Sequence, residues 1–314
     1  MHLNRRALRL CQRLVRAAGL ARIKVEARPG QARLVDCGVH APGGLAAGWW
    51  LARISLAGLA RVALVPADPA LGTGLAVMLS TDHPVLACLA SQYAGWRVTD
   101  QDYFAMLSGP IRAVAGQEAL FDSIGHRETA RAVVGVLESD RLPPVGVCDG
   151  LAARCGIAVD RLTLLVAPIT SQAGTIQVVG RSVETALHKL HLLGFDLGRI
   201  ESATGVAPLP PVAADPIVGI GRSNDAIIYG GQVTLYVRGD DASLVATGAQ
   251  VPSCASPDYG APFADLFRRY DHDFYRVDPH LFSPAVIVLV NLDTGHSFRF
   301  GCLAPEVLRS SFSC

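Results

Sequence analysis

The sequence contains few charged residues and almost no lysine. Of its 314 residues, 18% are Asp, Glu, Lys or Arg, and the formal net charge is +1. Lysine occurs only as Lys24 and Lys189, so nearly every positive charge is an arginine. A net charge this small gives no electrostatic reason to expect nucleic acid or an anionic membrane as a partner.

A long uninterrupted apolar run is also missing. The longest stretch without a charged residue covers 162–180, and it contains Pro168, Gln172 and Gly174. We interpret it as a buried strand, a loop and the start of a helix, because a membrane-spanning helix needs about 20 consecutive, predominantly apolar residues. No membrane partner is expected.

The eight cysteines include no CxxC pair, so their spacing does not indicate a zinc site. Two other groups contain residue types that bind metals, namely Asp271-His272-Asp273 and the pair His188 and His191, but neither has a third ligand at a recognisable spacing. We expect no metal, and we expect reduced thiols in a cytoplasmic protein.

Sequence motifs of other enzyme classes are absent. The chain has no G-x-S-x-G elbow, no phosphate-binding loop, no heptads and no internal repeat. Gly219 and Gly221 resemble half of a dinucleotide fingerprint, but the third glycine is missing and we expect no helix after them. The sequence predicts no bound cofactor.

Half of the residues are apolar, and a chain of this length can bury a large core. The Arg-rich N-terminus resembles an organelle transit peptide, but a first helix ending at Gly19 explains it equally well. We predict a mixed α/β fold of two lobes with mixed or antiparallel sheets. The predicted lobes are 1–168 and a hairpin-rich 169–314, with an approximate boundary and chain crossing between them.

The residue patterns also predict individual elements. Strands are expected at 33–39, 75–80 and 162–166, and helices at 45–65, 129–137 and 144–155. Gly230-Gly231 between two β-rich runs predicts a hairpin over 217–237, and Asp293-Thr294-Gly295 predicts another over 286–300.

The stretch 167–193 combines a predicted loop with a predicted amphipathic helix. After a loop ending at Gly174, the apolar residues Ile176, Val179, Val183, Leu187 and Leu190 recur at the three- and four-residue steps of a helix face. Arg181 and Glu184 lie three apart on another face and can meet. A solvated surface ion pair is the simpler interpretation of these two residues alone.

Several long sequence motifs occur in the same order as in one known protein family. They are SQYAGW (91–96), SGPIRA (108–113), APITSQAG (167–174), RSVETALHKL (181–190), LGFD (193–196), GRSNDAIIYGG (221–231), DYGAPF (258–263) and DFYRVDPHLFSPA (273–285). Through these motifs the chain resembles the methenyltetrahydromethanopterin cyclohydrolases over nearly its whole length. Ile111, Gly180 and Ser223 depart from the usual pattern, and Gly180 costs about 0.5–1 kcal/mol of helix propensity.

The resemblance implies the reversible hydrolysis of N5,N10-methenyl-tetrahydromethanopterin to the N5-formyl compound. The family's water-binding Arg and Glu map onto Arg181 and Glu184. Because the substrate is already a cationic amidinium, its carbon is electrophilic without a metal or a covalent nucleophile. Glu184 would carry the proton, and Arg181 would fix the geometry of the carboxylate and the water.

The resemblance also implies a pterin cleft between the lobes and a homotrimer. Residues are assigned to that cleft by motif membership alone, as substrate-binding candidates: Ser108, Gly109, Pro110, Thr170, Ser171, Asn224, Asp225 and Tyr259. Two rival interpretations stay open, namely a non-catalytic protein that binds a reduced pterin and a metal-dependent amidohydrolase acting on another ring. The preferred pterin carrier is not indicated by the sequence.

Overall fold

The computed structural model describes residues 1–273 and 276–313. It divides into two compact units, which we call unit 1 (Met1–Ala60 and Leu86–Gln177) and unit 2 (Arg61–Val85 and Val178–Cys314). Each unit contains a six-stranded sheet with both parallel and antiparallel neighbours, which confirms the predicted mixed α/β class. The sequence placed one boundary at residue 168, whereas here the chain changes unit after residues 60, 85 and 177.

Unit 1 is built around a sheet with the strand order β1-β2-β8-β7-β6-β5. Its three central strands β2, β8 and β7 run parallel, and the remaining pairs are antiparallel. The strands are β1 (Lys24–Glu26), β2 (Arg33–Asp36), β5 (Trp96–Asp100), β6 (Tyr103–Ser108), β7 (Val133–Glu138) and β8 (Leu162–Ala167). The helices are α1 (Leu3–Arg16), α2 (Ala18–Ala21), α3 (Leu45–Ser55), the π-helix η2 (Val85–Gln92), α4 (Ile111–Ala115), α5 (Leu120–Ile124), α6 (Val145–Arg154), η3 (Val159–Arg161) and α7 (Gln172–Val179).

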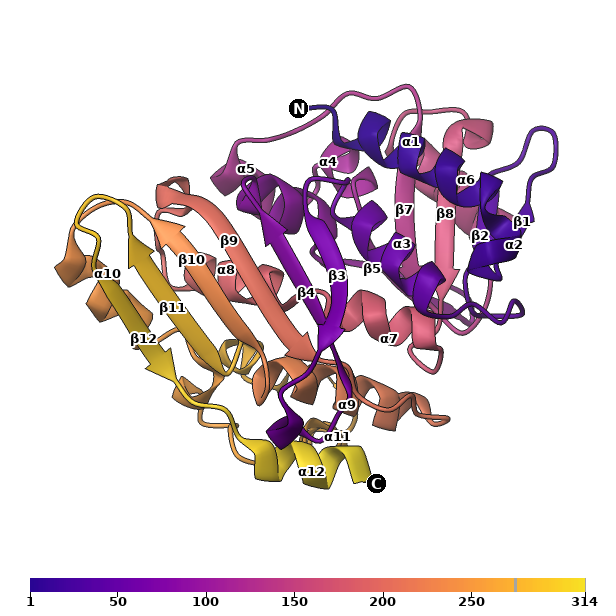
Figure 1. Cartoon of the computed structure of the whole chain (residues 1–314). Coiled ribbons are helices and arrows are strands. Elements are labelled where there is room, and N and C mark those ends of the chain that lie inside the picture. The colour runs from indigo at the N-terminus through magenta and orange to yellow at the C-terminus, as the bar shows by residue number, and fades with distance from the viewer. Residues whose placement is uncertain (274–275, 314) are drawn as a thin grey trace. The chain divides into compact units, whose positions relative to one another are not determined.

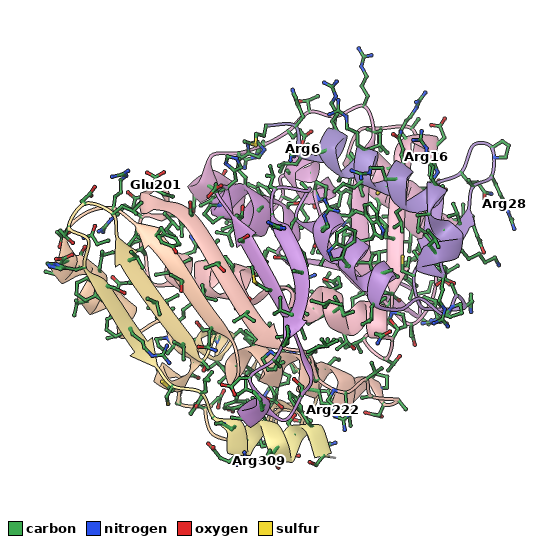
Figure 2. All side chains as sticks on the ribbon, viewed as in Figure 1. Arg6, Arg16, Arg28, Glu201, Arg222 and Arg309 are labelled. Atoms are coloured by element: carbon green, nitrogen blue, oxygen red, sulfur yellow. The ribbon has the colours of Figure 1, made fainter. Side chains whose placement is uncertain are left out.

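Helix α1 shows why the Arg-rich N-terminal stretch folds. Its apolar residues Leu3, Ala7 and Leu14 are fully buried, and the helix contributes to a core shared with α3 and the strands β2, β7 and β8. Its arginines lie on the outer face, and Figure 2 shows Arg16 and Arg28 projecting from the ribbon of this unit. The predicted first helix is therefore confirmed, but it ends at Arg16, and Gly19 lies in the short helix α2.

Unit 2 is built around a sheet with the strand order β12-β11-β10-β9-β4-β3, in which β10 and β11 are parallel and the other neighbours antiparallel (Figure 1). The strands are β3 (Arg61–Pro66), β4 (Leu75–Thr81), β9 (Ile200–Pro208), β10 (Gln232–Val237), β11 (Val286–Asn291) and β12 (Ser297–Gly301). The helices are η1 (Pro69–Leu71), α8 (Ser182–Leu192), η4 (Leu197–Arg199), α9 (Pro216–Ile228), α10 (Asp241–Gly248), η5 (Ser253–Ala255), α11 (Phe263–Arg269), η7 (Pro279–Leu281) and α12 (Pro305–Ser313).

The hairpin predicted over 217–237 is wrong, since its first half is helix α9. Asp215 caps this helix by accepting a hydrogen bond from Val218 N at 2.9 Å, and Pro216 occupies the first turn, where it needs no N–H partner. These start signals outweigh the β-branched residues of the segment. The hairpin predicted over 286–300 is confirmed as β11 and β12.

The helix predicted over 129–137 is also wrong, because strand β7 occupies Val133–Glu138. Almost every residue of this strand is buried, and it pairs with β6 on one side and β8 on the other. A strand covered on both faces loses the alternation of apolar and polar residues that identifies a strand in a sequence.

No helix among the described residues is long and apolar enough to cross a membrane.

Candidate active site

The predicted central helix is two helices, with a break at Gly180 and Arg181. Helix α7 ends at Val179 and α8 begins at Ser182, while Arg181 has φ −101° and ψ 9°. Arg181 N donates to Val178 O at 3.1 Å, and Thr185 N donates to Arg181 O at 2.9 Å. Gly180, a poor helix former, lies at this break. Arg181 therefore forms the N-cap of α8, and Glu184 lies in its first turn.

Arg181 and Glu184 form a buried ion pair. The guanidinium Nη1 lies 4.0 Å from the carboxylate Oε2, and the two side chains are only 8% and 6% exposed. The interpretation as a solvated surface pair is therefore wrong. Taking two charges out of water costs several kcal/mol per ion, as an approximate figure, unless partners compensate for it. Because the pair is shielded from bulk solvent, charges beside it interact more strongly than they would in water.

Strand β9 positions the first turn of α8. A Cβ atom added at Gly205 would lie 2.6 Å from Ser182 Oγ and 2.7 Å from Val183 Cγ2. Only glycine allows this approach, so the strand sets how closely the turn that carries Glu184 packs on the sheet.

We expect Gly205→Ala to destabilise the protein by about 1–3 kcal/mol, because Val183 must move away from the added methyl group. Gly19→Ala is the matched control, since a Cβ there meets nothing within 4 Å. Urea unfolding of both variants measures the difference. Equal stability of Gly205→Ala and the unmutated protein would show that the close approach is not needed.

The predicted site residues Thr170 and Ser171 lie in unit 1, in the loop between β8 and α7. Ser171 Oγ accepts a hydrogen bond from Gly174 N at 3.0 Å and donates to Pro168 O at 2.7 Å. Ser171 therefore caps the start of α7, while Thr170 is half-buried beside it. Both residues lie beyond the carboxyl end of β8.

Ser108, Gly109 and Pro110 also lie in unit 1, at the end of β6. All three are buried, and Ser108 Oγ donates to Val136 O at 3.3 Å. Gly109 has a φ of +96°, which favours glycine, and its N–H donates to Ser91 O at 2.8 Å. Gly109 and Pro110 therefore form a tight turn that leads from β6 into α4.

The structure separates these two groups within unit 1. Strand β6 runs antiparallel to β7, so its end pairs with Val136 and leads toward the amino end of β7. The Thr170 loop follows the carboxyl end of β8, which pairs with Glu138 at the other end of β7. The ends of β6 and β8 are therefore offset by two residues of β7, which is about 7 Å at about 3.3 Å per residue along a strand.

Asn224 and Asp225 lie on α9 in unit 2. Asn224 is half-buried, and its Nδ2 donates to Ile220 O at 2.8 Å. Asp225 is fully buried, and its carboxylate accepts hydrogen bonds from Phe263 N at 2.9 Å and Ser311 Oγ at 2.6 Å. Burial raises the pKa of Asp225 to about 7 against these two hydrogen bonds. Asp225 thus joins α9 to α11 and α12, and its contact with a substrate stays a prediction.

Tyr259 lies in unit 2 on the loop before α11. Its ring is 5.0 Å from that of Tyr229, whose hydroxyl donates to Ala261 O at 2.6 Å. Burial raises the pKa of Tyr259 to about 12, with a smaller contribution from the Cys302 and Cys254 thiols. The phenol therefore stays protonated at neutral pH and is able to donate a hydrogen bond.

Among residues 1–273 and 276–313 the structure contains no group of three or more His, Cys, Asp or Glu side chains arranged to hold a metal ion. Asp271, His272 and Asp273, whose residue types can bind a metal ion, are exposed. Part of the predicted motif 273–285 lies outside the described residues.

The chain resembles proteins of known name over almost its full length. The family model described as Cyclohydrolase (MCH) matches residues 2–312. The chain belongs to this cyclohydrolase family. A methenyltetrahydromethanopterin cyclohydrolase of Rhodopirellula baltica is 51% identical over 286 residues, covering 90% of this chain and 86% of that protein.

Two further relatives with the same name come from distant organisms. The cyclohydrolase of Methylobacterium sp. (strain 4-46) is 45% identical, and the aligned region covers 99% of this chain and 97% of that protein. That of Methanothermobacter thermautotrophicus is 37% identical, covering 98% of each chain. The cyclohydrolase family that the sequence motifs suggested is therefore confirmed.

One buried group of this cyclohydrolase was not singled out from the sequence. Lys189 lies on α8, five residues after Glu184, and is only 2% exposed. The available signal was its rarity, since the chain has one other lysine, together with its place between Leu187 and Leu190 on the buried side of the helix.

Proposed function

We propose that this chain catalyses the reversible hydrolysis of N5,N10-methenyl-tetrahydromethanopterin to N5-formyl-tetrahydromethanopterin. The observation that carries the proposal is the buried pair Arg181 and Glu184 at the start of α8, in a chain of the cyclohydrolase family. Relatives named for this reaction cover nearly the whole chain, which supports the choice of substrate.

In the proposed mechanism Glu184 is the proton carrier. Water adds to the methenyl carbon of the amidinium, and Glu184 accepts a proton from that water. The bond from the carbon to N10 then breaks, N10 takes up a proton from Glu184, and the carbon keeps the oxygen as a formyl group on N5. The second proton of the water is released, so the cationic substrate and water give a neutral product and one proton.

Arg181 has a different part in this proposal. Its guanidinium cannot lose a proton near neutral pH, so it serves as a fixed hydrogen-bond donor and not as a base. At 4.0 Å from Glu184 Oε2 it orients the carboxylate and leaves room for a water that both groups can contact. The negative carboxylate also attracts the cationic substrate.

The residues assigned by motif membership remain proposed substrate contacts, and no cofactor is required. Ser108, Gly109, Pro110, Thr170 and Ser171 would contribute from unit 1, and Asn224, Asp225 and Tyr259 from unit 2. Because a pterin with its tail is long, separated contacts are compatible with one ligand. Truncating a binding contact should raise KM more than it lowers kcat.

The test is the loss of methenyl-pterin absorbance after the purified protein is added. We expect turnover with a tetrahydromethanopterin-type carrier, either the archaeal form or a form with a shorter tail, and weaker turnover with the tetrahydrofolate analogue. Dialysis against a chelator should leave the rate unchanged, because the proposed mechanism uses no metal. Loss of activity that a divalent metal restores would favour the metal-dependent amidohydrolase.

The non-catalytic pterin-binding protein is the alternative, and the same preparation tests it. Such a protein would bind the methenyl carrier, detected by calorimetry, but leave its absorbance unchanged. A carboxylate and a guanidinium buried together would then have no catalytic use, although burying them has a cost in stability.

Compartment and assembly are further parts of the proposal. The described cysteines are all free, and Cys11, Cys37, Cys88 and Cys148 are buried, which fits a reducing cytoplasm. The homotrimer is carried over from the family resemblance. Light scattering of the purified protein tests the oligomeric state, and a mass equal to that of one chain would rule out the trimer.

A further inference from the structure

Helix α8 carries another buried charge besides the pair at its start. The Lys189 side chain is only 2% exposed, and its Nζ donates a hydrogen bond to His280 O at 2.9 Å. Burial lowers the pKa of Lys189, while the nearby Asp278 and Cys254 oppose that shift. The proposed mechanism gives this ammonium no role.

The groups around Lys189 are joined by hydrogen bonds to the described residues 254–273 and 276–281, which include Tyr259. Asp278 accepts a hydrogen bond from Ser256 Oγ at 2.6 Å, and its own N–H donates to Asp258 Oδ2 at 2.8 Å. The other oxygen of Asp258 accepts from Tyr270 OH at 2.8 Å. The two aspartates thus fix the shape of the loop that presents Tyr259.

Lys189 connects this segment to α8. The carbonyl that it binds, His280 O, is two residues from Asp278, and the Asp278 carboxylate also accepts from His280 N at 3.1 Å. The same helix carries Glu184 five residues earlier, so one rigid element holds the proton carrier at its start and anchors the Tyr259 loop further along. A well-packed apolar side chain in place of a buried charge is often neutral or stabilising, so stability alone does not explain the ammonium.

We propose that Lys189 is a positioning residue of the cyclohydrolase reaction, which holds the Asp258–Tyr259 loop against α8 and thereby sets the affinity for the substrate. The inference rests on the proposed function. Lys189 acts on binding through the loop, and it leaves the proton transfer at Glu184 unchanged.

The first test compares Lys189→Met and Lys189→Arg with the unmutated protein in KM, kcat and thermal unfolding. Methionine keeps the length of the side chain without the charge. We expect its KM to rise at least tenfold and its kcat to stay within threefold, whereas Lys189→Arg, which can still donate to His280 O, recovers most of the affinity. Lys24→Met is the matched control, since Lys24 is exposed and pairs only with Glu26 at 3.4 Å among the contacts seen.

A second measurement does not depend on activity. Burial and the Cys302 thiol raise the pKa of Cys254, and the Lys189 ammonium opposes this shift. In Lys189→Met the pKa of Cys254 should therefore rise further. The pH dependence of iodoacetamide alkylation, read by mass spectrometry of the Cys254 peptide, measures the change, with the same peptide from Lys24→Met as the reference.

The outcomes separate the inference from the function on which it rests. If the unmutated protein does not turn over the methenyl carrier, the proposed function fails, while the alkylation profile still shows whether the Lys189 ammonium lies beside Cys254. Unchanged KM in a folded Lys189→Met overturns the inference, as does a fall in kcat alone. If Lys189→Met does not fold, Lys189→Gln replaces it, and a KM for Lys189→Gln equal to that of the unmutated protein overturns the inference.

Discussion

Replacing Glu184 by Gln lowers the turnover number by about 10²–10⁴-fold at saturating methenyl substrate, the range for a positioned acid–base group. Glutamine keeps the shape of the side chain, and its amide can still donate and accept hydrogen bonds, but it cannot take a proton from water. Because Glu184 is 6% exposed, bulk buffer cannot easily replace it as the base. Stopped-flow measurement of the absorbance decay gives the rate.

The matched control is Glu201→Gln on strand β9. Glu201 is exposed and pairs with Arg238 at 3.0 Å, so its replacement should leave turnover unchanged (Figure 2). Turnover of Glu184→Gln within a few-fold of that of the unmutated protein would remove Glu184 from its proposed role. Circular dichroism of each variant shows whether a loss of activity reflects a loss of fold.

Asp225→Ala is expected to cause the largest loss of stability among the variants considered. Its carboxylate accepts from Phe263 N and Ser311 Oγ and so joins three helices of unit 2. Truncation leaves a buried N–H without an acceptor and a cavity, which together cost roughly 2–5 kcal/mol. Urea unfolding near pH 6 measures the change.

The same residue predicts a pH dependence whose sign follows from its pKa. Burial raises the pKa of Asp225 from 3.8 to about 7, so the folded state binds this proton more tightly than the unfolded state. The unfolding free energy should therefore fall as pH rises from about 4 to about 7, by at most about 1.4 kcal/mol per unit. Below that range the contribution is fully present.

Asp225→Asn isolates this effect, because an amide has nearly the same shape and does not titrate. The stability difference between the unmutated protein and Asp225→Asn should shrink as pH rises through that window. A difference independent of pH between 4 and 8 would contradict the raised pKa. A loss of less than about 1 kcal/mol in Asp225→Ala would contradict the role of Asp225 in joining the helices.

The candidate catalytic pair could be predicted from the sequence, but its burial could not. A spacing of three residues places Arg181 and Glu184 within reach on a helix, as the 4.0 Å separation confirms. The same pattern is typical of a solvated surface. Burial depends on contacts that are not local in the sequence, such as the close approach of β9 at Gly205 to Ser182 and Val183 in the same helical turn.

The errors in the predicted secondary structure also have identifiable causes. Around Ile217 and Ile227 the β-branched residues favoured strand, yet the cap at Asp215 and the proline after it begin a helix. Strand β7 lacks an alternating pattern because both of its faces are buried. In α9 capping overrode residue propensity, and in β7 burial of both faces removed the periodic pattern.

The predicted substrate-binding residues could be named, but their arrangement could not. Motif membership does not tell which strands pair. In the structure the Gly109 turn follows a β6 residue paired with Val136, while the Thr170 loop follows a β8 residue paired with Glu138. Long-range strand pairing of this kind is not encoded in either motif alone.

The most direct test of the central claim is a double-mutant cycle on Arg181→Met and Glu184→Gln, measured as turnover of the methenyl carrier by folded protein. If the two side chains act together on one water, each single variant loses about 10²–10⁴-fold and the double variant loses little more than the worse single variant. Losses that multiply in the double variant, or a single variant with turnover equal to that of the unmutated protein, would contradict the account.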